Sequence, residues 1–492
     1  MTSALHAETP ALSADHARPG DSARARLTRL LDHDSLVELG SQRRHQAASF
    51  GLDRRRPDSD GVIAGTGTVD GRPVDVYAQD RRVLGGSLGE AHADKIVRTI
   101  DEAVRGRVPV VGINDSGGAR IQEGVAALDG YGRVFSANVR ASGHVPQIAL
   151  VLGPCAGGAT YSPALMDFVV MTDEATMFLT GPRVVKAVTG EDVDARALGG
   201  PEVHGGRSGV AHFVAADDEA AFAICRDLLS YLPSSSSDAA PVAPARPPVD
   251  VDLRAIVPGD DRQPYDVRDV IAGIVDGGSL LEVQAGWARN LVIGFSRIDG
   301  RTVGIVANQA AWLAGVLDLQ AAEKGARFVR FCDAFGIPLV VLVDVPGFLP
   351  GTAQEGNGVI RKGAKLLHAF ASATVPRVTV VLRKAFGGSY IVMNSRSLGA
   401  DAVLAWPDAE LAVMGAEGAA DIIFRRQLDE RPDDRDDLIA GYRRDAMHVD
   451  LAAQRGSVDE IIAPERTREV LVGLLRSLRG RPPGFVHDNL PQ

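Results

Sequence analysis

The sequence predicts an α/β protein made of two similar domains in tandem. Short β-rich runs alternate with segments whose apolar residues recur at helical spacing. The strand-like runs are Val108–Ile113, Ile148–Leu152 and Phe168–Met171, and the helical segments include Asp94–Ala103 and Val125–Arg140. This alternation is typical of strands joined by crossover helices. With 492 residues, the chain also exceeds the size of one ordinary core.

An internal repeat predicts the tandem arrangement. The tripeptide DGR at residues 70–72 recurs at residues 299–301, an offset of 229. Repeated anchors at one spacing indicate that a single structural unit has been duplicated. The register continues with Leu84 and Gly86 on Leu313 and Gly315, Lys95 and Arg98 on Lys324 and Arg327, residues 108–118 on 337–347 (Asp115 on Asp344), and residues 145–158 on 375–388 at an offset of 230.

The segment between the two copies predicts the domain boundary. Residues 233–249 read PSSSSDAAPVAPARPPV, and this composition is typical of an extended linker. We therefore expect an N-terminal domain over residues 24–245 and a C-terminal domain over residues 246–492. Residues 1–23 are expected to form a disordered tail, because they lack the apolar core of a signal peptide.

Composition excludes several classes of protein. The net charge of −10 argues against a general nucleic-acid or membrane-surface binder, and no apolar stretch is long enough to span a bilayer. Cys155, Cys225 and Cys332 form no CxxC pair, which disfavours a zinc ribbon or a disulfide framework and favours a cytoplasmic location. The eleven histidines show no metal-ligand spacing, so we expect no metal on this chain.

The stretch GPCAGGATYSPAL at residues 153–165 allows three functional interpretations. Cys155 could be a nucleophile, the glycines could hold a phosphate, or Gly157 and Gly158 could present N–H groups to an oxygen anion. The repeat bears on this choice. The glycine pair recurs as Gly387 and Gly388, whereas Cys155 aligns with an alanine, which favours a structural cysteine. No Walker-type or GxGxxG loop supports the phosphate interpretation.

The oxyanion interpretation fits the local pattern in both copies. An apolar strand ends, two glycines follow, and a helix-like segment begins. Glycines let backbone N–H groups turn outward with no Cβ in the way, and N–H groups at a helix start lack partners within the helix. Such donors can stabilise negative charge on a carbonyl oxygen. A tight turn that only packs a helix closely against a strand remains an alternative.

Long motifs in both copies also carry a family resemblance. The chain resembles the carboxyltransferase (β) subunits of biotin-dependent acyl-CoA carboxylases, of the acetyl-CoA and propionyl-CoA carboxylase kind, from about Arg24 to its C-terminus. This resemblance implies two tandem crotonase-like domains and a homo-hexamer with active sites between the N-domain of one chain and the C-domain of another. The motifs are NDSGGARIQEG (114–124), GPCAGGATYSPAL (153–165), FLTGPRVVKAVTGEDV (178–193), DVPGFLPGTAQEG (344–356) and RKAFGGSYIVM (383–393).

The resemblance also implies roles for individual residues. Gly157 and Gly158 would hold the thioester oxygen of acyl-CoA, and Gly388 and Ser389 the ureido oxygen of biotin. Which turn serves which oxygen is left open. The resemblance assigns three further residues to the biotin side, namely Phe386, Gly387 and Gly351. It assigns Arg44 and Arg55 to the CoA phosphates. The residues assigned to the acyl-CoA side are Ser116, Gly117, Gly118, Ala119, Ala156, Tyr161, Tyr390 and Ile391.

Departures from the family pattern concern the substrate. Ile391 stands where an acid is common in propionyl-preferring members, which favours acetyl-CoA or a specialised acyl-CoA. Ala310 and Lys362 also differ from common family residues, and the segment Gln354–Asn357 lacks the larger residue that often follows its glutamate. The chain has no biotinyl-lysine signature and no domain that makes carboxybiotin, which implies a separate biotin-bearing α subunit. Alternatives are a decarboxylase of malonyl- or methylmalonyl-type thioesters and a non-catalytic subunit that organises a carboxylase complex.

Overall fold

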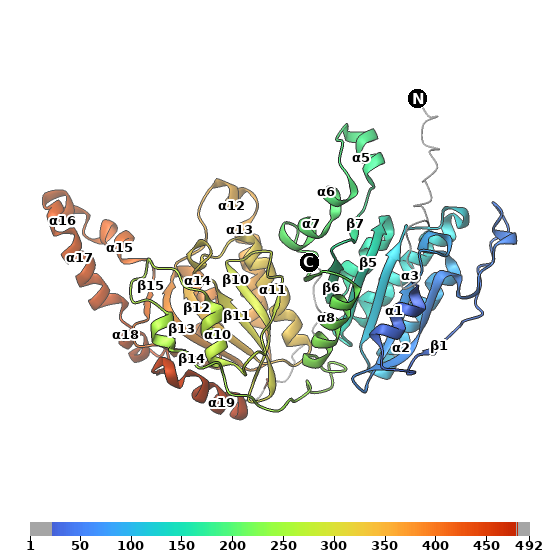
Figure 1. Ribbon diagram of the computed structural model, residues 1–492. Helices are drawn as coiled ribbons and strands as arrows, with labels where there is room; N and C mark the ends of the chain where they lie inside the picture. Colours follow the sequence, from blue (N-terminus) through green and yellow to red (C-terminus); the bar gives the residue numbers. More distant parts are fainter. Residues whose placement is uncertain (1–21, 479, 481–492) are drawn as a thin grey trace. The chain divides into compact units, whose positions relative to one another are not determined.

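The chain divides into two compact units, each with its own sheet and helices (Figure 1). The computed structural model describes residues 22–478 and residue 480. The first unit ends at Asp238 and the second begins at Ala239, within the segment predicted to be a linker. Of the tail predicted over residues 1–23, only Ser22 and Ala23 lie within the described residues, where they begin the first helix.

The sheet of the first unit combines an antiparallel edge with a parallel centre. Its strand order is β1-β2-β3-β4-β5-β6-β8, with β7 paired to β5 beyond the main path. β2 and β3 form a hairpin whose loop residues Asp70 and Gly71 both have positive φ, as a two-residue turn of this type requires. The strands are β1 (Val37–Glu38), β2 (Val62–Val69), β3 (Arg72–Gln79), β4 (Val110–Ser116), β5 (Gln147–Ala156), β6 (Phe168–Thr172), β7 (Thr176–Phe178) and β8 (Phe213–Ala215).

The second unit repeats this topology strand for strand. Its order is β9-β10-β11-β12-β13-β14-β16, with β15 paired to β13. Asp299 and Gly300 again have positive φ in the hairpin loop, so the repeated DGR tripeptide marks the same turn in both copies. The strands are β9 (Leu281–Val283), β10 (Leu291–Ile298), β11 (Arg301–Asn308), β12 (Leu339–Val345), β13 (Arg377–Phe386), β14 (Ala402–Ala405), β15 (Glu410–Ala412) and β16 (Glu460–Ile461).

Helices provide the crossover connections that parallel strands need. In the first unit α2 packs on α3 and α1 on α8, and in the second α11 packs on α13 and α10 on α19. The predicted strands and helices are confirmed, with ends shifted by a few residues. The helices are α1 (Ala23–Leu30), α2 (Glu90–Gly106), α3 (Val125–Ala141), α4 (Tyr161–Leu165), α5 (Pro182–Thr189), α6 (Ala195–Gly199), α7 (Pro201–Gly206), α8 (Asp218–Tyr231), α9 (Leu253–Ile256), α10 (Val267–Ile274), α11 (Leu319–Ala334), α12 (Thr352–Gly356), α13 (Val359–Ser372), α14 (Gly387–Val392), α15 (Ala416–Ile423), α16 (Arg425–Glu430), α17 (Arg435–Tyr442), α18 (Val449–Gln454) and α19 (Thr467–Ser477).

In each unit, a buried lysine on a long helix, α2 or α11, donates hydrogen bonds to the carbonyl of the first residue of a strand. Lys95 of α2 donates from Nζ to the carbonyl of Val62, the first residue of β2, at 2.5 Å. Lys324 of α11 donates to the carbonyl of Leu291, the first residue of β10, at 2.7 Å, and also faces the carbonyls of Gln284, Trp287 and Ala288. Burial lowers the pKa of Lys95 to about 8 and that of Lys324 to about 7.

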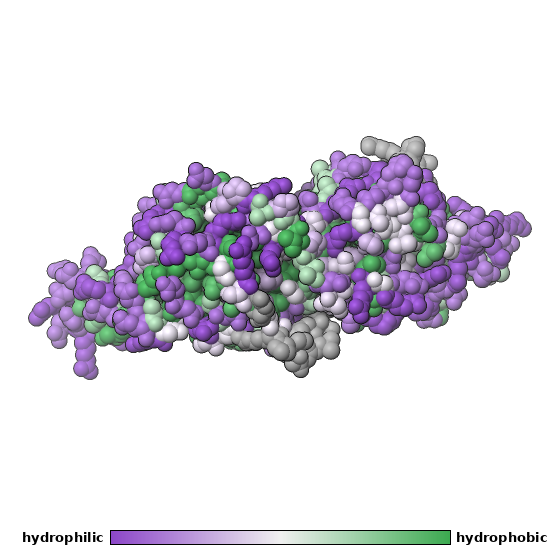
Figure 2. All heavy atoms as spheres, turned by 90° about the horizontal axis from the view of Figure 1, so that it is seen from below, coloured by the Kyte–Doolittle hydropathy of each residue, from purple (hydrophilic) through white to green (hydrophobic). Residues whose placement is uncertain are grey.

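Most of the surface is polar, with separate apolar patches. Figure 2 shows one face of the molecule, largely covered by hydrophilic residues. Helix α5 exposes Val184 and Val188, and α15 exposes Ile422 and Ile423. Exposed apolar helices of this kind are candidate contact surfaces for other chains. Within the described residues, no helix is both long and apolar enough to cross a membrane.

Candidate active site

A β-bulge shifts the pairing of the fifth strand of each unit just before its glycine pair. Between β4 and β5, Asn114 pairs with Val151 and Ser116 pairs with Cys155, so Asp115 alone faces residues 152–154. Beyond the bulge, β5 leaves the main sheet order and pairs with β7, from Pro154 to Ala156. A bulge of this kind re-aims the end of a strand. Here it directs the strand end toward the Gly157–Gly158 turn.

The second unit has the same bulge. Val343 pairs with Val381 and Val345 pairs with Ala385, so Asp344 faces residues 382–384. Beyond it, β13 pairs with β15 from Lys384 to Phe386. The repeated aspartate therefore marks the same backbone feature in both units.

The glycine pairs adopt the same backbone conformation in both units. The φ angle is 61° at Gly157 and 60° at Gly387, in the left-handed region where glycine is favoured. A short helical segment begins at once, Gly157–Thr160 in the first unit and α14 in the second. The first N–H groups of these segments have no acceptor within the helix. The predicted sequence of strand, glycine turn and helix is thus confirmed in both copies.

In the first unit, the fold brings the predicted 116–119 loop against the glycine turn. A Cβ on Gly118 would lie 2.9 Å from the carbonyl oxygen of Ala156, and a Cβ on Gly158 would lie 3.1 Å from the ring of Tyr131. These close approaches explain why glycine occupies both positions. Tyr161 follows on α4, half exposed, with its ring against the edge of Phe135.

The 116–119 loop is itself held by hydrogen bonds. Ser116 Oγ donates to the carbonyl of Gly86 at 2.7 Å, and the Gly117 N–H donates to the carbonyl of Gly85 at 3.0 Å. Ala119 forms a parallel bridge with Leu88. The Ser116 side chain is therefore occupied in shaping the loop, and the small residues leave the space beside the glycine turn free of bulk.

The two predicted phosphate-binding arginines lie on the segment that precedes β2. Arg44 is exposed and pairs with Asp58 at 2.6 Å. Arg55 is exposed, and its carbonyl accepts a hydrogen bond at 2.8 Å from the buried His45 ring. Among the described residues, no hydrogen bond or ion pair joins either guanidinium to the 116–119 loop. Their role stays a prediction.

In the second unit, the glycine turn is more open. No atom lies within 4 Å of a Cβ built on Gly388. Ser389 is buried, and its Oγ donates to the carbonyl of Phe386 at 2.7 Å, which leaves its backbone N–H as the group for binding. Ile391 is 43% exposed on α14, whereas Tyr390 points its hydroxyl toward the carbonyl of Ser457 at 3.5 Å. Gly351 lies on the loop after β12, with φ of 132°.

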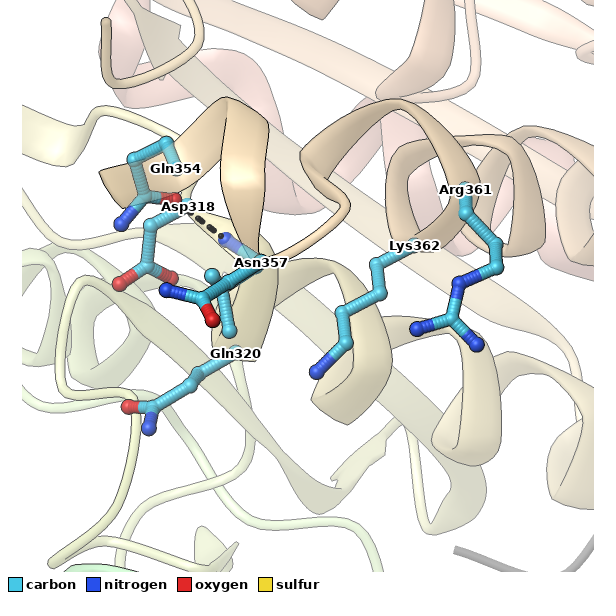
Figure 3. A pocket seen from close by; sticks show the side chains of 7 residues that line it. Asp318, Gln320, Gln354, Asn357, Arg361 and Lys362 are labelled. Atoms are coloured by element: carbon cyan, nitrogen blue, oxygen red, sulfur yellow. Dashed lines mark hydrogen bonds between the residues drawn. The ribbon is translucent and has the colours of Figure 1, made fainter. Parts of the chain in front are cut away.

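Two cavities of about 460 Å³ each lie in this part of the second unit. One is apolar and runs from residues 348–350 to α13 and Val392 of α14. The other is polar; Figure 3 shows Asp318 and Gln320 from the start of α11, Gln354 and Asn357 around α12, and Arg361 and Lys362 from α13. The Leu319 N–H donates to Gln354 Oε1 at 3.1 Å. Lys362, which departs from the family pattern, thus lines this polar cavity.

The structure argues against the nucleophile interpretation of Cys155. Its thiol is fully buried, and burial raises its pKa well above the ordinary value, so the reactive thiolate is disfavoured. Cys225 and Cys332 are buried and unpaired as well. Within the described part of the chain, no group of three or more His, Cys, Asp or Glu side chains could hold a metal ion.

The sequence reasoning missed the buried charges behind the glycine turns. Asp115 pairs with Arg26 of α1 at 2.8 Å, and Asp344 pairs with Arg383 of β13 at 3.0 Å. The alignment of Asp115 on Asp344 was the available signal. It also missed Arg120, which is buried and pairs with Asp60 at 2.7 Å.

Comparisons with known proteins identify the family of the chain. The sequence model of the carboxyl transferase domain family matches residues 14–486. The propionyl-CoA carboxylase beta chain of Saccharopolyspora erythraea is 52% identical, over 99% of this chain and 94% of the relative. The acetyl-/propionyl-coenzyme A carboxylase beta5 subunit of Mycobacterium tuberculosis is 48% identical, over 97% and 90%.

A solved structure matches over nearly the same length. The transcarboxylase 12S hexamer, with methylmalonyl-coenzyme A and methylmalonic acid bound, superposes with a TM-score of 0.92 and 53% identity, over 96% of this chain and 93% of that one. The tandem crotonase-like fold expected from the sequence is confirmed. By fold, by the repeated glycine turns and by sequence, the chain belongs to the carboxyltransferase family of the biotin-dependent acyl-CoA carboxylases.

Proposed function

We propose that the chain transfers a carboxyl group from biotin on a partner subunit to the α-carbon of a short acyl-CoA. The observation that carries this proposal is the pair of glycine turns with matching φ at Gly157 and Gly387. The reaction creates negative charge on two oxygens, that of the thioester and that of the biotin ureido group. The two glycine turns supply two sets of backbone N–H donors, and each set can stabilise one developing oxyanion.

The first turn is proposed to hold the thioester oxygen. The amides of Gly157 and Gly158 would donate to it, while Ser116–Ala119, Ala156 and Tyr161 would line the acyl side. The close packing of Gly118 on Ala156 supports this arrangement, because it leaves no side chain between loop and turn. Arg44 and Arg55 are proposed to reach the CoA phosphates.

The second turn is proposed to hold the ureido oxygen through the amides of Gly388 and Ser389. When bound, biotin supplies the carboxyl group and a ring nitrogen that can accept the α-proton of the acyl-CoA. The residues present fit such a group, because the space beside Gly388 is open and an apolar cavity reaches Val392 on the same helix. Phe386, Gly387 and Gly351 would shape this side, so that water is kept from the developing charge.

Assembly and location complete the proposal. A separate α subunit would carry biotin, and six copies of this chain would form the hexamer, in a cytoplasmic setting. The hexamer named for the 12S relative and the exposed apolar faces of α5 and α15 support the assembly. Residues 24–245 would provide the acyl-CoA side and residues 246–492 the biotin side, with each active site completed by two copies.

The acyl-CoA choice is proposed to depend on Ile391. An apolar, half-exposed side chain at this position, where propionyl-preferring members commonly have an acid, favours acetyl-CoA or a specialised acyl-CoA over propionyl-CoA. The test is the ratio of kcat/KM for the two substrates in the native chain and in Ile391→Asp. An unchanged ratio would remove Ile391 from the determinants of specificity.

The decisive experiment mixes the chain with its biotinylated α subunit, ATP and bicarbonate, and measures carboxylation across a panel of acyl-CoAs. Carboxylation of none of them would contradict the proposal. Release of CO2 from malonyl- or methylmalonyl-type thioesters without ATP would favour a decarboxylase instead.

A pair of valine substitutions tests whether the chain is catalytic. Gly388→Val fills open space at the second turn, and Gly132→Val fills open space on α3 as the matched control. We expect activity to fall by about 100-fold in the first only, because the valine side chain would occupy the space through which the oxygen reaches the N–H groups, and the loss should match that of one donor of an oxyanion hole. Unchanged activity in both would support a scaffold role.

A further inference from the structure

Each bulge that precedes a glycine turn is closed by a buried aspartate–arginine pair. In the first unit, Arg26 Nη1 donates to Asp115 Oδ2 at 2.8 Å, and Nη2 donates to the carbonyl of Leu152, inside the bulge, at 3.1 Å. Its Nε donates to Asp218 Oδ2 of α8 at 2.9 Å. Both Arg26 and Asp115 are less than 5% exposed. The pair thus ties α1, β4 and the bulge of β5 together.

In the second unit, the arginine comes from the bulge itself. Arg383 contacts Asp344 Oδ2 through Nε at 3.1 Å and through Nη2 at 3.0 Å. Its Nη1 faces the carbonyls of Pro258, Asp260 and Gln263. The other aspartate oxygen, Oδ1, accepts the backbone N–H of Lys384 at 3.1 Å. Both oxygens of Asp344 are therefore bonded.

Two residue exchanges explain why the first unit needs a distant arginine. Gly153 occupies the position of Arg383, and a Cβ there would lie 2.5 Å from Asp115 Oδ1, so any side chain would displace that carboxylate from its present place. Pro154 occupies the position of Lys384 and has no N–H to donate. Asp115 Oδ1 consequently has no hydrogen-bond partner, with Arg81 Nε 4.0 Å away. Each aspartate nevertheless pairs with an arginine, Arg26 from α1 in the first unit and Arg383 from the bulge itself in the second.

We infer that Asp115 with Arg26, and Asp344 with Arg383, are positioning residues that hold the two bulges in the shape that aims the glycine N–H groups. The inference rests on the proposed function, in which those N–H groups bind the reacting oxygens. Neither pair is exposed enough to contact a substrate, so each would act through the backbone. A displaced donor weakens catalysis steeply, by about 100-fold for a shift near 1 Å.

A neutral replacement separates positioning from stability. Replacing a buried ion pair by apolar residues of similar shape is often neutral for stability, whereas removing one partner alone is costly. The double variant Arg26→Met/Asp115→Leu removes both charges of the pair, but it leaves the partly exposed Asp218 and the carbonyl of Leu152 without this donor, so the thermal midpoint is expected to fall by at most about 10 °C. It loses the bond to the carbonyl of Leu152 and with it the fixed bulge.

The test measures three quantities on the assembled complex: the thermal midpoint, kcat with KM for acyl-CoA, and amide hydrogen exchange in a peptide that covers residues 155–161. We expect kcat at least about tenfold lower with KM within about threefold, and faster exchange in that peptide. Arg29→Met, one turn along α1 on a partly exposed pair with Glu219, is the matched control and should leave all three unchanged. Native kcat and native exchange in a stable double variant would overturn the inference.

A second variant covers the case in which the double variant does not fold. Arg26→Lys keeps the charge beside Asp115, but one ammonium cannot reproduce the fork that reaches Asp115 and the carbonyl of Leu152. Lower kcat and faster exchange are expected again, and native values of both would overturn the inference. Because exchange needs no turnover, it reports on the bulge even if the native complex carboxylates no acyl-CoA, so this inference and the proposed function can fail separately.

Discussion

The two units share a backbone but differ in the contacts that support it. Gly157 and Gly387 have nearly equal φ, yet a Cβ on Gly387 would lie 3.0 Å from the carbonyl of Val413, whereas the nearest atom to one on Gly157 is 3.9 Å away. Lys324 faces four carbonyls where Lys95 faces two. The two copies thus share their glycine turns and their sheet order. We expect them to differ in how much stability the same substitution costs at matching positions. Matched substitutions in the two units measure that divergence.

The largest difference is expected at the buried lysines. Lys324→Met removes a donor from four carbonyls. Those of Gln284 and Ala288 keep a backbone N–H partner, whereas those of Trp287 and Leu291 lose the lysine, and a buried carbonyl left without a partner costs about 1–3 kcal/mol. We expect a loss of at least about 3 kcal/mol in the free energy of unfolding, and a smaller loss for Lys95→Met. Urea titration measures both. Lys365→Met, on the surface of α13, should stay within about 0.5 kcal/mol. Equal losses at positions 95 and 324 would contradict the comparison.

The glycine turns should differ next. Gly157→Ala and Gly387→Ala each force a side chain into the left-handed region, at a cost of about 1–3 kcal/mol. Gly387→Ala should cost more, because its Cβ also meets the carbonyl of Val413. Thermal unfolding ranks the two variants. Gly388→Ala, which has open space and ordinary φ, serves as the control for stability; a larger loss there than at position 387 would show that strain is not the cause.

The pH dependence of stability should reveal the lowered pKa of Lys324. Its pKa is lowered to about 7 from an ordinary 10.5, chiefly by burial, so between these values the unfolded chain binds more protons than the folded one. Stability then rises with pH across this window and falls as pH drops toward 7, by up to about 1.4 kcal/mol per unit. Urea midpoints at several pH values, compared with Lys324→Met, isolate this slope. Parallel curves for the two proteins would refute the assignment.

The smallest effect is expected at Cys155. In the second unit an alanine, Ala385, occupies the matching position, also fully buried. Cys155→Ala should therefore keep kcat within about twofold and cost about 1 kcal/mol of stability, as a small cavity does. Loss of activity with retained stability would revive the interpretation of this thiol as a nucleophile.

The sequence could predict the fold because its signals are local and repeated. Apolar runs, helical spacing and the DGR turn are each readable within a few residues, and the second copy confirms their register. The glycine turns were predictable for the same reason, because positive φ restricts the residue type. The resemblance supplied their proposed chemistry, which local pattern alone left open.

The supporting contacts could not be predicted because they are distant in sequence or involve backbone atoms. Arg26 lies 89 residues from Asp115 and has no counterpart in the second copy. Lys95 and Lys324 were recognised as repeat anchors, but carbonyl acceptors leave no signature in the sequence, so their role was not foreseen. The sequence also could not show whether Arg44 binds a phosphate, because an exposed arginine can equally form a surface ion pair, as Arg44 does with Asp58.

The exchange of Gly153 and Pro154 for Arg383 and Lys384 has a consequence for how such a chain can evolve. An arginine at position 153 would clash with Asp115, and loss of Arg26 would leave that carboxylate buried beside a proline that cannot donate. Each single step is therefore expected to be harmful, whereas the second unit carries the whole combination, so we expect strong epistasis between these positions. Positions 26, 115, 153 and 154 are expected to vary together among relatives, whereas the second unit keeps its arginine and aspartate on adjacent strands and can drift independently of any distant helix.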